Sequence, residues 1–133
     1  MKVTPKTADY ALFNCQPDEA RAALYQDMVF ESGRAAAEIG LWPLDRHCST
    51  QLNGIPDCPV MILAGEHDRV TPATTCEKLA QHIGAQYECL QGHGHWLPSE
   101  PGWDIIATQC EAWLKLKGVI SESETEESLF SVT

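Results

Sequence analysis

The sequence predicts an α/β fold in which parallel strands are flanked by helices. A continuous apolar stretch at residues 58–64 is typical of a strand that is buried on both faces of a parallel sheet. A helical pattern at residues 71–83 and a second strand pattern at residues 87–90 follow it. The order of strand, helix and strand indicates parallel pairing through a right-handed crossover.

Three segments are expected along the 133 residues. Residues 1–52 form a helical segment, residues 53–117 form a β-α-β-α core, and residues 118–133 form an acidic, disordered tail. The tail holds four of the 19 acidic residues and none of the nine basic ones, so it is expected to stay solvated.

The N-terminal segment carries helical signals over residues 14–42. Pro17 opens a helix at its first turn, and the acidic pair Asp18 and Glu19 favours the positive end of that helix. A second short helix is expected from Ser32 to Gly40.

Capping residues mark the elements of the second half. Gly65 is expected to end the first strand, and Thr71 and Pro72 are expected to be the N-cap and first-turn proline of the next helix. Gly84 is a fitting stop for that helix. Its predicted apolar face consists of Cys76, Leu79, Ala80 and Ile83.

A last helix is expected to start near Pro101 and to end at Gly118. The helical period places five apolar residues on one of its faces, and these are Trp103, Ile106, Cys110, Trp113 and Leu114.

Charge and hydropathy exclude several classes of protein. A net charge of −10 disfavours binding to nucleic acid or to an anionic membrane surface, because both require a basic patch. The longest apolar run is far shorter than a membrane span. The N-terminus has no apolar core of a secretory signal, so a cytoplasmic protein is expected.

Six cysteines are spread along the chain without any C-x-x-C pair. This spacing favours reduced, mostly buried thiols over a disulfide framework or a metal site. The six are Cys15, Cys48, Cys58, Cys76, Cys89 and Cys110.

Two loops with ionisable residues follow the two predicted strands. They span residues 65–72 and 92–98, and ligands of parallel sheets bind at this edge. Asp68 and His95, 27 positions apart, can form a carboxylate–imidazole pair there. The carboxylate fixes the tautomer of the ring, and the other ring nitrogen becomes a general base.

These motifs resemble the C-terminal part of the α/β-hydrolase superfamily. The resemblance rests on Cys-Pro-Val-Met-Ile-Leu-Ala-Gly-Glu-His-Asp-Arg-Val-Thr-Pro at residues 58–72, followed by Gly-His-Gly-His-Trp at 92–96 and Glu-Pro at 100–101. It covers about residues 54–116. It implies a partial α/β-hydrolase fold for this chain.

The resemblance also implies roles for single residues. Asp68 would be the acid of a catalytic triad and His95 its base. His95 is preferred to His93 because it directly precedes Trp96, as in the superfamily's histidine loop. Glu100 would be a supporting carboxylate beside the pair or a carboxylate at the start of the last helix.

The N-terminal segment, residues 1–52, resembles the helical cap that covers the site in many members. Trp96 and Trp42 would then line an apolar substrate pocket, although an ordinary packing role for each stays open. The resemblance implies no organic cofactor and no metal.

The nucleophile of the superfamily is not found in this sequence. Its serine lies in a G-x-S-x-G elbow upstream of the acid, and only Ser32 and Ser49 precede Asp68 here, both without the flanking glycines. The expected function is therefore that of a C-terminal fragment of a serine-type hydrolase. It would act on a small, apolar, ester-like substrate with a nucleophile from elsewhere, and activity of this chain alone is uncertain.

Three alternatives remain at the level of the sequence. An inactive, truncated hydrolase could serve as an interaction module, as a homodimer or with a complementing subunit, because missing strands leave an unpaired sheet edge. His67, Asp68, His93 and His95 could bind zinc. Finally, Asp68 could merely cap a helix while His95 is an ordinary loop histidine.

Overall fold

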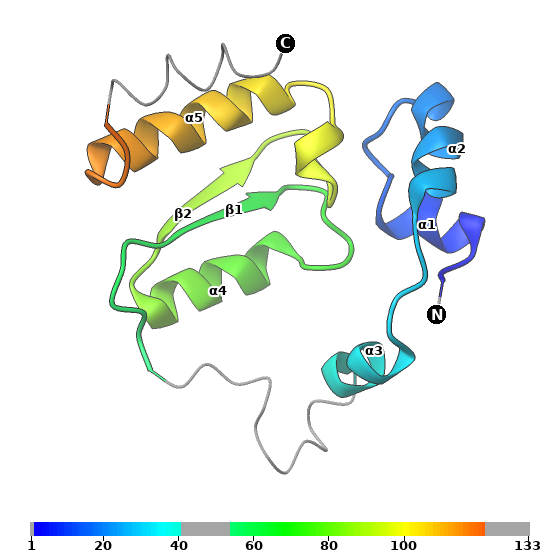
Figure 1. Ribbon diagram of the computed structural model, residues 1–133, viewed down its shortest axis with the longest axis horizontal. Helices are drawn as coiled ribbons and strands as arrows, with labels where there is room; N and C mark the ends of the chain where they lie inside the picture. The colour runs from blue at the N-terminus through cyan, green and yellow to red at the C-terminus, as the bar shows by residue number, and fades with distance from the viewer. Residues whose placement is uncertain (1, 41–53, 122–133) are drawn as a thin grey trace. The chain divides into compact units, whose positions relative to one another are not determined.

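The computed structural model describes residues 2–40 and 54–121. The chain divides into two compact units, residues 1–96 and 97–133. The described elements of the first unit are α1 (Pro5–Ala11), α2 (Asp18–Asp27), α3 (Gly33–Gly40), β1 (Met61–Gly65), α4 (Ala73–Ile83) and β2 (Gln86–Leu90) (Figure 1).

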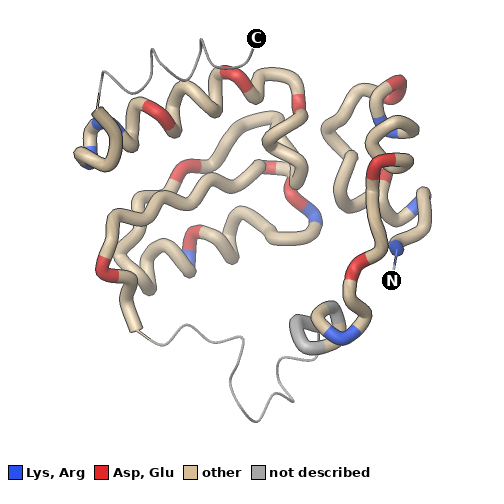
Figure 2. Tube along the Cα trace, viewed as in Figure 1, with Lys and Arg blue, Asp and Glu red and all other residues tan. Residues whose placement is uncertain are grey.

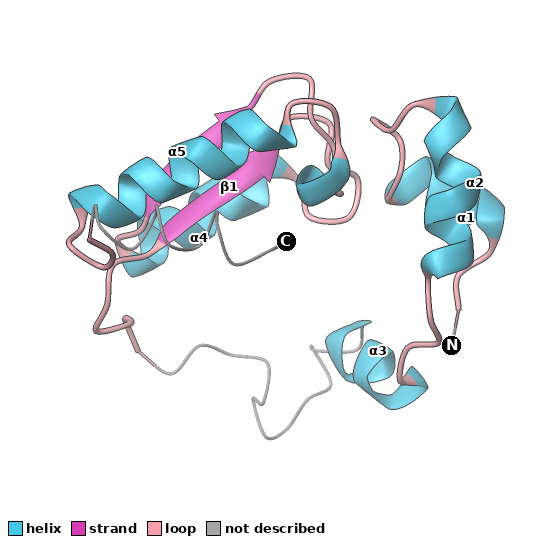
Figure 3. Cartoon of the chain, turned by 45° about the horizontal axis from the view of Figure 1, so that its top comes forward, coloured by secondary structure: helices cyan, strands magenta, loops and turns pink. Residues whose placement is uncertain are grey.

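The two strands form a parallel sheet. Met61 pairs with Gln86 at one end of the register, and Gly65 pairs with Leu90 at the other. The crossover helix α4 packs against both strands (Figure 3). The chain thus combines helices with a parallel sheet, as the α/β prediction requires.

The first strand is shorter and less buried than predicted. It begins at Met61 rather than at residue 58, because Pro59 has no N–H to donate to a ladder. Only Ala64 and Gly65 are fully buried in it, whereas residues 61–63 are half-buried. The prediction of a strand buried on both faces is therefore wrong for the first three residues of β1.

The predicted C-terminal end of the crossover helix α4 is confirmed. Gly84 has φ 68°, and its N–H donates to the Ala80 carbonyl. The helix starts at Ala73 with Pro72 as N-cap, one residue later than predicted. Leu79 is 46% exposed, so it does not belong to the buried face, which a sheet of this width covers only in part.

The N-terminal helices are confirmed in part. Helix α2 follows Pro17, and α3 lies within the predicted range 32–40. The chain is not helical at residues 28–32, so the helical pattern of 14–42 is interrupted there. Residues 41–53 lie outside the described part of the chain.

Helix α1 was not predicted from the sequence. Its N-cap is Thr4, whose hydroxyl oxygen accepts the Thr7 N–H at 3.2 Å, and Pro5 occupies the first turn. The same threonine–proline pair that marks the start of α4 was therefore the signal for this helix.

The second unit contains a 3₁₀ helix (Leu97–Ser99) and α5 (Trp103–Leu116). Gly102, with φ 90°, precedes α5, so the helix begins two residues after Pro101. Gly118, with φ 69°, follows its end. Of its predicted apolar face Ile106 is buried, whereas Trp103 is 54% exposed. The tail beyond residue 121 and the predicted boundary at 52–53 lie outside the described residues.

The five described cysteines are free thiols, and none of them is fully buried. Cys58 is exposed, and the other four are half-buried, so mostly buried thiols were a wrong prediction. The strand β1 begins at Met61, which leaves the Cys58 thiol outside the strand. Cys48 falls outside the described residues.

Charged residues are scattered over the helices and loops (Figure 2). Basic positions do not gather on one element in the part of the chain that is drawn in full. None of the helices described in 2–40 and 54–121 has the length and apolar character needed to cross a membrane.

Candidate functional site

The loops that follow β1 and β2 meet at the carboxyl edge of the sheet. The Glu66 N–H donates to the Leu90 carbonyl at 3.0 Å, and the His67 N–H donates to the His93 carbonyl at 2.8 Å. Backbone pairing therefore continues beyond the last residue of each strand. It fixes the two loops side by side, as consecutive parallel strands require.

A close approach of backbone to backbone makes Gly65 necessary at the end of β1. A Cβ atom at this position would overlap the Gly94 carbonyl oxygen and would lie 2.7 Å from the His93 carbonyl oxygen. Any other residue would push the histidine loop away. The sequence indicated that Gly65 ends the strand, but not that it admits the second loop.

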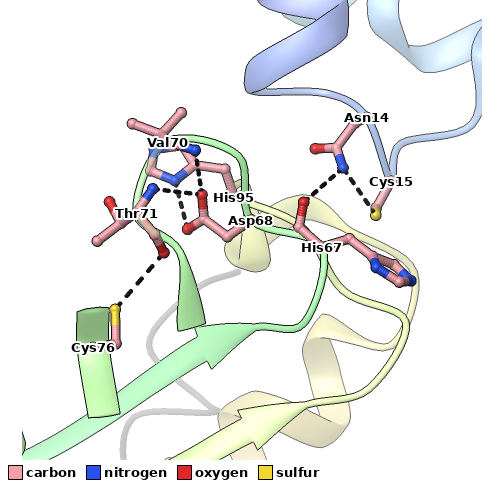
Figure 4. Close-up of polar contacts among 8 residues, drawn as sticks. All are labelled: Asn14, Cys15, His67, Asp68, Val70, Thr71, Cys76 and His95. Atoms are coloured by element: carbon pink, nitrogen blue, oxygen red, sulfur yellow. Dashed lines mark hydrogen bonds and ion pairs between the residues drawn. The ribbon is translucent and has the colours of Figure 1, made fainter. Parts of the chain in front are cut away.

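Asp68 uses its two carboxylate oxygens for different tasks. Oδ1 accepts the N–H groups of Val70 and Thr71, both at 2.8 Å, and so holds the turn before α4 (Figure 4). Oδ2 lies 2.9 Å from Nδ1 of His95. The side chain is only 9% exposed. Asp68 thus holds the turn before α4 with one oxygen and contacts His95 with the other, but it does not cap α4, whose N-cap is Pro72 and which has no side-chain cap.

The ring of His95 contacts Asp68 through Nδ1, and Nε2 is the nitrogen that can act as a base. Because Oδ2 of Asp68 can only accept, Nδ1 carries the proton of the bond, and the neutral ring has its lone pair on Nε2. The side chain is 29% exposed, so a small molecule can reach the ring. The structure therefore brings together the two residues that the sequence singled out.

Trp96 takes part in packing. Its ring meets the fully buried ring of Phe13 edge to face, with centroids 5.3 Å apart. Phe13 was missed by the sequence reasoning, because its burial depends on a contact with Trp96, which lies far from it in the sequence. Trp42, the other predicted pocket residue, lies outside the described part of the chain.

The turn after α1 contacts the loop that carries Asp68. The Asn14 side-chain N–H donates to the His67 carbonyl at 2.9 Å. Arg69 donates to the Tyr10 carbonyl at 3.0 Å, and its guanidinium lies 4.5 Å from the centre of the Tyr10 ring. An open pocket of about 440 Å³ lies beside these contacts. It is lined by Asn14, Cys15, Glu66, His67, Asp68 and Arg69.

The charge of Asp68 acts on a neighbouring thiol. Partial burial raises the pKa of the Cys76 thiol above its ordinary value, and the negative charge of Asp68 raises it further. The Cys76 Sγ lies 3.8 Å from the Thr71 carbonyl, to which the thiol donates. Cys76 is therefore held as a neutral thiol beside the carboxylate.

Glu100 lies in the second unit and is 1% exposed. Its backbone carbonyl accepts the Trp103 N–H at 3.0 Å, just before α5, whose N-cap is Gly102 and which has no side-chain cap, so the role predicted for the Glu100 carboxylate stays a prediction. Among the residues described in both units, no three His, Cys, Asp or Glu side chains come together as a metal centre requires. The zinc alternative thus gains no support.

Comparison with known proteins finds no relative: the chain matches no family model, no curated protein and no solved structure.

Proposed function

We propose that Asp68 and His95 are the acid and the base of a serine-type α/β hydrolase whose nucleophile comes from outside this chain. The observation that carries the proposal is the contact of 2.9 Å between Nδ1 of His95 and Oδ2 of Asp68 at the carboxyl edge of a parallel sheet. Ligands of such sheets bind at this edge.

The geometry supports general-base catalysis by His95. Nε2 would take the proton of an attacking hydroxyl group, from a serine of a complementing subunit or from water, and Asp68 would stabilise the resulting imidazolium. The same nitrogen would then return the proton to the leaving alcohol of a small, apolar ester. No organic cofactor is required for these steps.

The rate expected for this chain alone is low. Loss of one triad member costs a factor on the order of 10⁴ in other triad enzymes. With water as the nucleophile, the Asp68–His95 pair still supplies the proton transfer, which is worth a factor of about 10² or more.

Steady-state hydrolysis of p-nitrophenyl acetate at pH 7.5 tests the proposal. His95→Gln is expected to lower the protein-catalysed rate at least about tenfold. The matched control is His82→Gln, because His82 is an exposed histidine in the last turn of α4, and its rate should equal that of the wild type. Equal rates for His95→Gln and the wild type would refute a role for His95.

A second candidate function is association through the sheet. In the described residues β1 and β2 form a sheet of two strands, so each strand has an edge without a strand partner there. Sedimentation velocity between about 1 and 100 μM tests this candidate. A mass that rises with concentration is expected for an interaction module, whereas a monomer over the whole range would refute it.

A further inference from the structure

A second group of reactive side chains lines the pocket of about 440 Å³, which Asp68 also lines. Cys15 lies in the turn between α1 and α2, is half-buried and lines this pocket together with His67. The Asn14 side-chain N–H points at the Cys15 Sγ from 3.6 Å. A hydrogen-bond donor aimed at sulfur stabilises a thiolate more than a thiol.

His67 lines the same pocket as Cys15. Its side chain is 55% exposed, and its Nε2 lies 3.6 Å from Oε2 of Glu66. That carboxylate oxygen is itself fixed, because it accepts the Gly92 N–H at 3.0 Å. Figure 4 shows the Cys15 thiol and the His67 ring on the same side of the Asn14 amide, which bonds to both residues.

We propose that Cys15, His67 and Glu66 form a second reactive site, in which Cys15 is acylated by small acyl thioesters. A nucleophile, a base and a group that orients the base are the three parts that covalent catalysis by cysteine requires. Here Cys15 is the nucleophile, His67 is the base and Glu66 orients the ring. The inference does not depend on the function proposed for Asp68 and His95.

The reaction is a thiol–thioester exchange and needs no further reactant. His67 takes the proton of the Cys15 thiol, and the thiolate sulfur attacks the carbonyl carbon of the substrate. The carbon–sulfur bond of the substrate then breaks, and its thiolate takes the proton back from the His67 imidazolium. The products are an acyl-Cys15 thioester and a free thiol.

The surroundings of the pocket favour this substrate class. A volume of about 440 Å³ suits a small molecule. A thioester exchanges with a thiol without a net change in bond type, so the acyl group can pass to Cys15 without an activated co-reactant. The two carboxylates Glu66 and Asp68 outnumber the single arginine, Arg69, in the lining of this pocket, so a neutral acyl compound is preferred to an anionic one.

In the test, the full chain is incubated with the acetyl thioester of N-acetylcysteamine at pH 7. Peptide mass spectrometry then measures the rate at which each cysteine is acetylated. Accessibility alone predicts that the exposed Cys58 reacts faster than the half-buried Cys15. The proposal predicts the opposite order, with Cys15 acetylated at least about tenfold faster than Cys58. Faster acetylation of Cys58 would overturn it.

Substitutions of histidine distinguish activation of the Cys15 thiol by His67 from simple exposure of the thiol to the reagent. His67→Gln is expected to lower the acetylation rate of Cys15 at least about tenfold, whereas His82→Gln leaves the rate unchanged. Since His67 is largely exposed, its replacement should not unfold the chain, and circular dichroism checks this point. An unchanged rate in a folded His67→Gln variant would show that His67 is not the base. In 8 M urea the difference between Cys15 and Cys58 should disappear.

Discussion

At the residue scale, Asp68 links the folding of a turn to the chemistry of the site. One oxygen holds two backbone N–H groups before α4, and the other oxygen faces His95. Substitutions of Asp68 can therefore test separately how it holds the turn and how it contacts His95.

Asp68→Ala is expected to lower the free energy of unfolding by about 2 kcal/mol, because two backbone N–H groups lose a charged acceptor. Asp68→Asn keeps one acceptor oxygen, so we expect roughly half of that loss. Urea unfolding followed by circular dichroism measures both. The exposed Asp57→Ala variant is the control, with a change within about 0.5 kcal/mol. Equal losses for Asp68→Ala and Asp57→Ala would show that Asp68 does not stabilise the turn before α4.

The pKa of the Cys76 thiol depends on its burial and on the charge of Asp68. Burial raises its pKa most and Asp68 raises it further, so the thiolate forms at higher pH in the folded than in the unfolded chain. This contribution to stability is complete below the unfolded pKa of the thiol and is lost as the pH rises through the folded pKa.

Asp68→Asn is expected to lower the pKa of Cys76, but not to its unfolded value, because the larger cause, burial, remains. The pH dependence of iodoacetamide labelling at Cys76 measures this shift. A midpoint that is the same in the wild type and in Asp68→Asn would show that the carboxylate does not act on this thiol.

At the scale of elements, the site depends on how closely the histidine loop approaches the end of β1. Gly65→Ala is expected to cost about 3 kcal/mol of stability or more, because its Cβ meets backbone atoms that cannot rotate away. Gly33→Ala is the matched control: no atom lies within 4 Å of its added Cβ, and a helical position should gain up to about 1 kcal/mol. Thermal unfolding compares the two variants, and a neutral Gly65→Ala would contradict the close approach.

An aromatic contact joins the turn after α1 to the histidine loop. Phe13 is fully buried and meets Trp96, so Phe13→Ala is expected to cost about 3–5 kcal/mol. Phe30 is 81% exposed, and Phe30→Ala should change stability by less than about 0.5 kcal/mol. Equal effects of the two substitutions in urea unfolding would show that the Phe13 contact does not stabilise the fold.

At the scale of the whole molecule, local signals predicted the elements better than their burial. Gly84 and the threonine–proline pair at residues 71–72 are local, and they placed the ends of α4 within one residue. The exposure of Leu79 depends on how many strands lie beneath the helix, which no pattern in the helix itself can show.

The residues of the candidate site also differ in how well the sequence predicts them. Asp68 and His95 were predictable, because strand order alone brings the carboxyl ends of consecutive parallel strands together. Phe13, Asn14 and Cys15 were not, since their approach to the site depends on packing between segments that are more than 50 residues apart in the sequence.

The central claim is that Asp68 fixes His95 as a base with its lone pair on Nε2. Nitrogen-15 NMR of the imidazole rings above pH 8 tests it most directly, because the two tautomers have different shifts. The claim predicts a proton on Nδ1 of His95 in the wild type and a mixture of tautomers in Asp68→Asn. A proton on Nε2 of His95 in the wild type would contradict it.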